Sequence, residues 1–233
     1  MQTGMRYLAV VVAALAFVPG AAGSGADLYG ANCIECHGPQ GEGIHDRGPS
    51  LRGVGARAAD FYLRTGYMPL GNPHDQPHRS RVQFSPRELA QLVAYVASFE
   101  GGPPIPHPDP ASGNLAQGQE LFTEHCAGCH QIDAKGGYVT NAVAPALDKA
   151  SAVEIAEAVR TGPYLMPRFS EKQIGDDQLN SLIRYVQYAK HPDDRGGWAL
   201  GHVGPVPEGL VTWFIAIAVL IGTCAAIGQR IRS

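Results

Sequence analysis

The chain has 233 residues, enough for one large domain or two small ones. Its formal net charge is −3, so no basic surface indicates nucleic-acid binding. Glycine (29 residues) and proline (18 residues) are frequent and alternating β-branched runs are few, which argues against a sheet-based fold and predicts an all-α fold of short helices.

Residues 1–26 have the composition of a targeting segment. Arg6 precedes an apolar run over residues 8–18, and small residues suited to cleavage follow at 21–23. The run is shorter than the about 20 residues that a membrane span needs. We therefore expect a signal peptide cleaved near Gly23, with an uncleaved N-terminal anchor as the alternative. In both cases the domain that follows is exported.

A short helix is expected over residues 27–36, and its end carries Cys33, Cys36 and His37. Two cysteines three positions apart with a histidine directly after the second are typical of a covalent c-type haem site. The thiols add to the vinyl groups of one porphyrin, and His37 becomes an axial ligand of the iron. A redox dithiol and half of a zinc site are the alternatives.

The rest of the first predicted domain, residues 27–100, contains two further helices. Residues 56–64 are expected to form one, closed by Gly66. A polar loop over 71–83 is either an interface or a solvated insertion, of which the insertion is favoured. Ser85 and Glu88 predict a capping box for the last helix, which is expected to end at Gly101 and Gly102.

Residues 101–114 are rich in proline and predict an extended, semi-rigid linker between two domains. Residues 115–200 then repeat the pattern of the first domain. A helix over 118–129 is expected to deliver Cys126, Cys129 and His130 as a second haem motif, and the later loops and helices recur in the same order. The sequence thus predicts a tandem duplication of one small helical domain.

Met68 and Met166 are the only methionines outside the targeting segment, and each follows an Arg-Thr-Gly sequence and precedes a proline. This matched context assigns them as the second axial ligands, Met68 with His37 and Met166 with His130. His74 and His78 follow Met68 closely, so bis-histidine ligation at the first haem stays open as an alternative.

Residues 210–228 contain no charged side chain and as a helix measure about 28 Å, close to the hydrocarbon thickness of a bilayer. They predict a C-terminal transmembrane helix, preceded by a juxtamembrane segment over 201–209. Arg230 and Arg232 in the tail, residues 229–233, predict that the tail is cytoplasmic. The haem domains are then expected on the outer face of the cell membrane.

Each repeat resembles a class I cytochrome c domain. In that family a proline carbonyl accepts the N–H of the motif histidine, which implies this role for Pro49 and Pro145. The whole chain resembles the dihaem cytochrome c subunit of the actinobacterial-type cytochrome bcc complex, because its span is C-terminal and is approached through residues 204–210. The resemblance implies two covalently bound haem c groups and a place in a menaquinol–cytochrome c oxidoreductase, without substrate chemistry of the chain's own. It also implies cytochrome b and Rieske iron–sulfur subunits as partners and an aa3-type oxidase as electron acceptor.

Other functions stay open at this point. A membrane-anchored dihaem cytochrome could serve another exported dehydrogenase or a nitrite reductase. The dihaem subunit of a cbb3-type oxidase carries its span ahead of the haem domains, unlike this chain. A dihaem peroxidase needs an open sixth position on the iron, against which the paired methionines argue. Residues 25–100 hold seven arginines and eight acidic residues, whereas residues 114–200 hold eight basic and eleven acidic residues, so we expect the two domains to face different partners.

Overall fold

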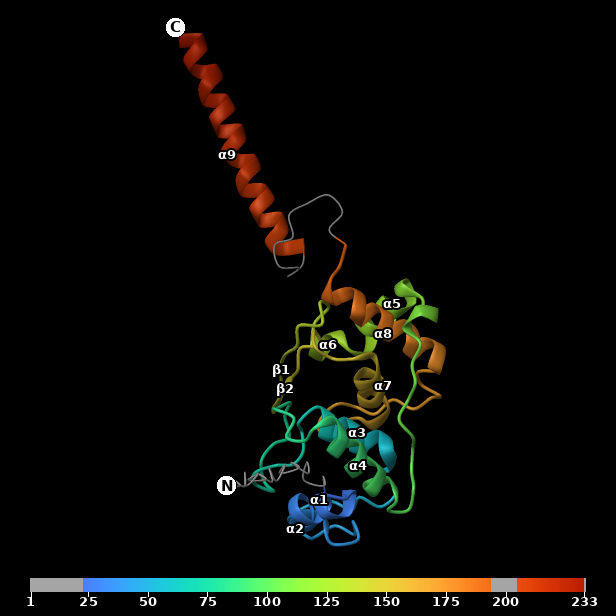
Figure 1. The fold of residues 1–233 in the computed structure, drawn as a ribbon. Helices are drawn as coiled ribbons and strands as arrows, with labels where there is room; N and C mark the ends of the chain where they lie inside the picture. The colour runs from blue at the N-terminus through green and yellow to red at the C-terminus, as the bar shows by residue number, and fades with distance from the viewer. Residues whose placement is uncertain (1–22, 194–204, 233) are drawn as a thin grey trace, which may run out of the picture.

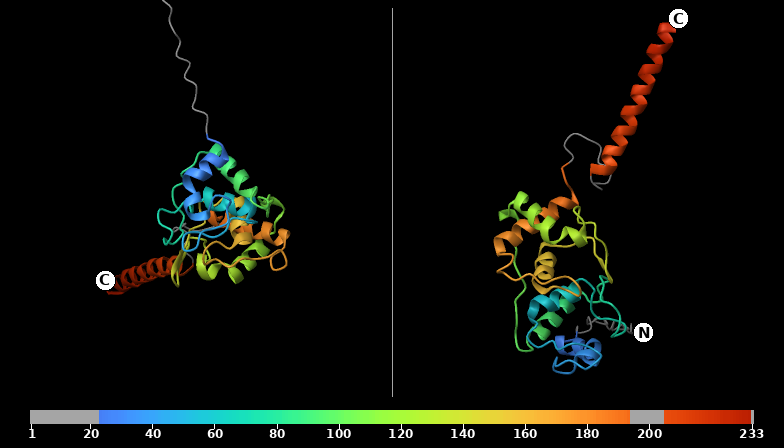
Figure 2. Two further views of the ribbon diagram at one scale, coloured as in Figure 1. Left: turned by 90° about the horizontal axis from the view of Figure 1, so that it is seen from below. Right: turned by 180° about the vertical axis from the view of Figure 1, so that it is seen from behind.

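The computed structural model describes residues 23–193 and 205–232 (Figure 1). Most of the expected targeting segment, residues 1–22, and the start of the expected juxtamembrane segment, residues 201–204, lie outside the described residues. The described chain forms two small helical domains in contact with each other and a long C-terminal helix. Figure 2 shows the same arrangement from below and from behind.

The first domain is built around the contacts of its last helix with the two longer helices before it. Its elements are α1 (Gly25–Asn32), α2 (Ile34–His37), α3 (Gly55–Arg64) and α4 (Pro86–Ala97). Helix α4 packs against both α1 and α3. Its apolar stripe is buried and consists of Leu89, Leu92, Val93 and Val96.

Helix α4 begins with the expected capping box. The Ser85 side chain accepts the backbone N–H of Glu88, and the Glu88 side chain accepts the backbone N–H of Ser85. The expected end of this helix is wrong. It stops at Ala97, and Ser98 caps it by donating its backbone N–H to carbonyls of the last turn. Glycine is therefore not needed to close the helix, because a residue of ordinary α conformation already does so.

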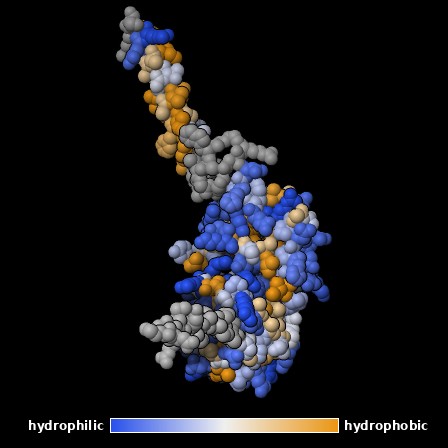
Figure 3. All heavy atoms as spheres, in the orientation of Figure 1, coloured by the Kyte–Doolittle hydropathy of each residue, from blue (hydrophilic) through white to orange (hydrophobic). Residues whose placement is uncertain are grey.

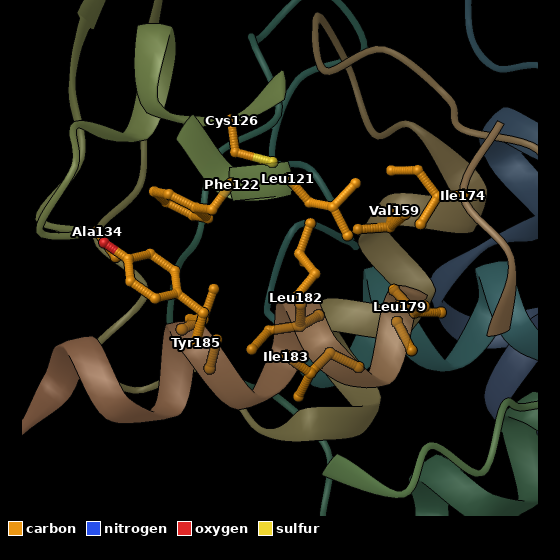
Figure 4. Close-up of a cluster of buried hydrophobic side chains, with 14 of the residues drawn as sticks. Leu121, Phe122, Cys126, Ala134, Val159, Ile174, Leu179, Leu182, Ile183 and Tyr185 are labelled. Atoms are coloured by element: carbon orange, nitrogen blue, oxygen red, sulfur yellow. The ribbon is translucent and has the colours of Figure 1, made fainter. Parts of the chain in front are cut away.

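The second domain repeats this arrangement around the crossing of α5 and α8. Its elements are η1 (Pro110–Ser112), α5 (Leu115–His125), α6 (Ala127–His130), β1 (Gly137–Val139), β2 (Ala142–Ala144), α7 (Ala152–Thr161) and α8 (Asp176–Lys190). In the core, Leu182 of α8 points toward Leu121 of α5, and Phe122 and Ile183 belong to the same buried cluster (Figure 4). The rings of Phe122 and Tyr185 lie 5.2 Å apart between centroids.

One glycine in each domain allows two helices to touch, α1 with α4 in the first domain and α5 with α8 in the second. Gly25 and Gly118 occupy equivalent positions, at the same spacing before the first cysteine of each motif. A Cβ atom on Gly25 would overlap the carbonyl oxygen of Gln91 in α4, and one on Gly118 would overlap that of Ser181 in α8. The first and last helices of each domain therefore approach at backbone distance.

The described chain is mostly helical, as the expected all-α fold requires, and departs from it at one short antiparallel hairpin, in which β1 pairs with β2 and Val139 lies opposite Ala142. Asn141 turns the chain there with a φ of 63°, a conformation that asparagine tolerates. Strands of three residues are too short to produce a recognisable alternation in sequence. The expected continuous helices over 27–36 and 118–129 are each broken at the first cysteine of the motif.

The two domains meet where α3 packs against α7. The loop over residues 71–83 also crosses to the second domain, since Arg79 forms an ion pair with Glu154 at 3.3 Å. The linker is tied at both ends. The backbone N–H of Arg57 donates to the carbonyl of Pro103 at 3.1 Å, and the N–H of Asp109 donates to the Asn180 side chain at 2.9 Å.

Helix α9 (Pro205–Arg232) contains the segment expected to cross the membrane. Within residues 209–231 the most apolar 18-residue window has a mean hydropathy of 2.4, and none of that window is buried by the rest of the described chain. Its surface is largely apolar along its length, in contrast to the mostly hydrophilic surface of the two domains (Figure 3). So much apolar surface is unfavourable in water and needs an apolar environment, which a bilayer supplies.

Candidate functional site

The two cysteine–histidine motifs have the same backbone geometry. Cys33 has φ −125° and ψ −29°, and Cys126 has φ −122° and ψ −36°. In each motif the carbonyl of this first cysteine accepts two N–H groups, from the second cysteine at 3.1 Å and from the histidine at 2.9 Å. The break in the helix therefore forms a separate single turn that carries the second cysteine and the histidine.

Both motif histidines are buried and are oriented by a proline carbonyl. The Nδ1 atom of His37 lies 2.8 Å from the carbonyl oxygen of Pro49, and that of His130 lies 3.0 Å from the carbonyl oxygen of Pro145. A carbonyl oxygen only accepts hydrogen bonds, so Nδ1 must carry the proton. The Nε2 atom then holds the lone pair that a metal ion requires, and the hydrogen bond fixes the plane of the ring.

Burial also favours the ligand form of the second histidine. The His130 side chain lies in an apolar environment that lowers its pKa, while the hydrogen bond to Pro145 partly opposes this shift. A lower pKa keeps the imidazole neutral at physiological pH, which leaves Nε2 available for coordination.

The first thiol of each motif is poorly suited to the alternative of a redox dithiol. Burial raises the pKa of Cys33 and of Cys126 to about 11, and the neighbouring cysteine of each motif adds to the rise. Reactive dithiols work in the opposite sense, with a lowered thiol pKa. The zinc alternative lacks further ligands, since no group of three or more His, Cys, Asp or Glu side chains fit to hold a metal ion occurs within residues 23–193 and 205–232.

In the second domain the candidate residues line one cavity of about 630 Å³. The cavity is enclosed mainly by apolar side chains, and Cys126, Cys129, His130, Pro145 and Met166 all reach it. Its size falls in the range of roughly 300–1,000 Å³ that is usual for cofactor sites. Two thiols, a neutral imidazole and a thioether around an apolar space are the groups that a haem c needs, so the residues present fit this cofactor.

In the first domain the structure places two of the candidate residues against one core. Cys33 and Met68 both pack against the buried cluster that includes Tyr29 and Leu92. The histidines of the bis-histidine alternative lie elsewhere: His74 is exposed, and His78 lines the cavity of the second domain. The structure therefore gives no support to His78 as a ligand in the first domain.

A tyrosine hydroxyl in each domain, which sequence reasoning missed, holds the chain just after the motif histidine. Tyr29 of α1 donates to the carbonyl of Gly38 at 2.7 Å, and Tyr185 of α8 donates to the carbonyl of Ile132 at 2.8 Å. The donor comes from the first helix in one domain and from the last helix in the other. The repeat alignment pairs Tyr29 with Phe122 and Tyr95 with Tyr185, so neither pair marks the tyrosine that donates.

Comparison with known proteins matches both domains to cytochrome families. A model described as cytochrome c covers residues 22–100, and one described as cytochrome c oxidase, cbb3-type, subunit III covers residues 113–186. Among curated relatives, the cytochrome bc1 complex cytochrome c subunit of Corynebacterium diphtheriae is 38% identical over 88% of this chain and 80% of its own length. That of Mycobacterium bovis is 36% identical over 89% of this chain and 77% of its own. The chain belongs to the family of cytochrome bc1 complex cytochrome c subunits.

Membership of this cytochrome c subunit family confirms the resemblance noted from the sequence. It also explains the fit of the motifs, because cytochrome c domains bind haem c covalently. A more distant relative, the cbb3-type cytochrome c oxidase subunit FixP of Rhizobium meliloti, is 26% identical over 71% of this chain and 60% of its own length.

Proposed function

We propose that this cytochrome c subunit holds two haem c groups and relays electrons from the Rieske iron–sulfur protein of a cytochrome bc complex to an aa3-type terminal oxidase. The observation that carries the proposal is the equivalence of the two motifs, each with a buried histidine whose Nδ1 is bonded to a proline carbonyl. The names of the relatives support the bc complex as the assembly in which it works.

The residues of this chain divide the work of holding each haem. Cys33 and Cys36 would bind the first porphyrin through their thiols, and Cys126 and Cys129 would bind the second. His37 and His130 would present Nε2 to the iron, with their rings fixed by the carbonyls of Pro49 and Pro145. We assign Met68 and Met166 as the sixth ligands, which the cavity lining supports for Met166. When bound, each haem supplies a one-electron iron couple whose potential the thioether raises.

If a histidine and a methionine of the chain hold each iron, they would leave no place there for a substrate. The chain's part is then to bind the haems, to exclude water from them and to hold them in two domains that touch through α3 and α7. We infer that the first domain accepts electrons and the second passes them on. The difference in acidic residues between the domains supports separate partners for the two steps.

Helix α9 anchors the relay in the cell membrane. Its apolar segment, residues 209–231, is long enough to span the bilayer. We propose that Arg230 and Arg232 lie on the cytoplasmic side, since positively charged residues favour that side, and that both haem domains lie outside.

Purification of the native complex tests this function. The chain should co-purify with b-type haem, an iron–sulfur protein and aa3-type haem, and a pyridine haemochrome assay should give two haem c per chain. Quinol should reduce both haems, and an inhibitor of the quinol site should prevent this. A chain that leaves the membrane without b-type haem or an iron–sulfur protein would contradict the assignment.

A second candidate is the dihaem subunit of a cbb3-type oxidase, which the family model over residues 113–186 and the similarity to FixP favour. The same purification separates the two. A copper-containing oxidase in the complex, without any iron–sulfur protein, would favour this candidate instead.

A further inference from the structure

The cavity of the second domain is partly walled by the first domain. Phe61 and Tyr67 of the first domain line it, together with residues 76–79 of the loop over 71–83. The same cavity contains His130 and Met166. The loop is therefore part of the surroundings of the second haem site and is not only a solvated insertion.

The loop is held in place where it meets the cavity. The backbone N–H of Ser80 donates to the carbonyl of Thr65 at 3.3 Å, and the Ser80 hydroxyl donates to the carbonyl of Gly66. Gly66 has a φ of 71°, and a Cβ there would overlap the backbone of Ser80. These contacts fix the backbone next to Arg79 against the end of α3.

Arg79 brings a positive charge to this cavity. Its guanidinium lies 3.3 Å from the carboxylate of Glu154, which also lines the cavity. The Arg79 side chain is 35% exposed and that of Glu154 is 9% exposed, so water screens the pair only in part. Among the described residues that line the cavity there is no other arginine and no lysine.

The charge of Arg79 acts on the neighbouring groups of the cavity. Burial raises the pKa of Tyr67, and the charge of Arg79 offsets part of this rise. Arg79 and Tyr67 are therefore close enough to interact at the wall that the first domain contributes.

A haem carries two carboxylate side chains, and the planar guanidinium of arginine suits carboxylates better than any other side chain does. We propose that Arg79 of the first domain binds a carboxylate of the haem in the second domain and sets the reduction potential of that haem. The inference rests on the proposed function, because it requires a haem in the second domain. A nearby positive charge stabilises ferrous haem, which carries one positive charge less than ferric haem. The potential of the second haem then depends on contact with the first domain.

A redox titration of the full-length, detergent-solubilised dihaem protein tests this. The second haem is identified beforehand as the component whose midpoint potential falls in Met166→His, since histidine lowers the potential relative to methionine. In Arg79→Gln the midpoint potential of the second haem should fall while that of the first stays constant. Arg79→Lys keeps the charge and should stay close to wild type.

Two further variants keep the test decisive. Arg81→Gln removes an exposed charge from the same loop and should leave both potentials unchanged. Glu154→Gln should raise the potential of the second haem, because it removes a negative charge while a glutamine can still complete the cap of α7.

The role of Arg79 would be overturned if Arg79→Gln left the midpoint potential of the second haem unchanged, or lowered the potentials of both haems equally. An equal fall of the second potential in Arg81→Gln would overturn it as well. A fall in Glu154→Gln would do the same. Purified wild-type protein with only one haem per chain would instead overturn the proposed cofactor content, so the two failures are distinguishable.

Discussion

Asp60 of α3 and Glu157 of α7 face each other across the contact between the two domains. Glu157 is 0% exposed and Asp60 is 3% exposed. The guanidinium of Arg64 binds both oxygens of Asp60, at 2.8 and 2.6 Å. Burial and the Asp60 and Glu154 carboxylates raise the pKa of Glu157 to about 8, although Arg64 opposes the rise.

This pair predicts how stability depends on pH. Between about pH 4.5 and about pH 8, Glu157 is protonated in the folded protein and ionised in the unfolded chain, so the folded state binds more protons. The free energy of unfolding should therefore fall as pH rises through this window, by up to about 1.4 kcal/mol per pH unit from this group. Glu157→Gln should remove this contribution. Denaturant unfolding at several pH values measures it.

Glu120→Gln is the matched control, because Glu120 is an exposed glutamate on α5. It should retain the wild-type dependence on pH. If Glu157→Gln showed the same slope as wild type between about pH 5 and about pH 8, the buried carboxyl would not be the group responsible.

The assignment of Met68 and Met166 as axial ligands predicts separable losses. Met68→Ala should remove the thioether-to-iron absorption of the first haem in the ferric spectrum and lower its midpoint potential, and Met166→Ala should do so for the second. Each single variant should keep one of the two contributions, and the double variant should lose both. An unchanged ferric spectrum in either single variant would show that its methionine is not a ligand.

The glycine at the helix crossing of the first domain predicts a loss of stability. Gly25→Ala should lower the free energy of unfolding by about 1–3 kcal/mol, because the new Cβ forces α1 away from the Gln91 carbonyl in α4. Gly30 lies in the same helix with nothing within 4 Å of a Cβ. Gly30→Ala should therefore raise stability by roughly 0.5–1 kcal/mol. Equal effects of the two substitutions in chemical denaturation would contradict the close crossing.

The C-terminal helix predicts the attachment of the protein. A chain ending at residue 204 should lose α9 and, with it, the apolar segment that is long enough to cross the bilayer. If the N-terminal segment is cleaved, the truncated protein should appear in the soluble exported fraction with its haem spectrum intact. Full-length protein should resist alkaline extraction. A truncated protein that stays in the membrane would indicate an uncleaved N-terminal anchor.

Much of the site could be predicted from sequence because its chemistry is local. The two thiols and the histidine of each motif must lie within one turn, so their spacing along the chain directly indicates a haem site. The duplication also allowed assignments over longer distances along the chain. A methionine and a proline occur at corresponding positions in both repeats, Met68 with Met166 and Pro49 with Pro145, which favours a role in the site for each pair. The apolar run of α9 likewise predicts a membrane environment from its composition alone.

The remaining features depend on contacts between segments that are far apart in the chain. Arg79 and Glu154 are separated by 75 positions, and no periodicity links a loop arginine to a glutamate in another domain. The burial of Glu157 against Asp60 likewise exists only once α7 packs on α3. The candidate haem ligands and the apolar helix could be predicted from the sequence, since covalent chemistry and hydropathy act locally. Which charges of one domain reach the cavity of the other could be seen only in the folded protein, because that follows from how two folded surfaces pack.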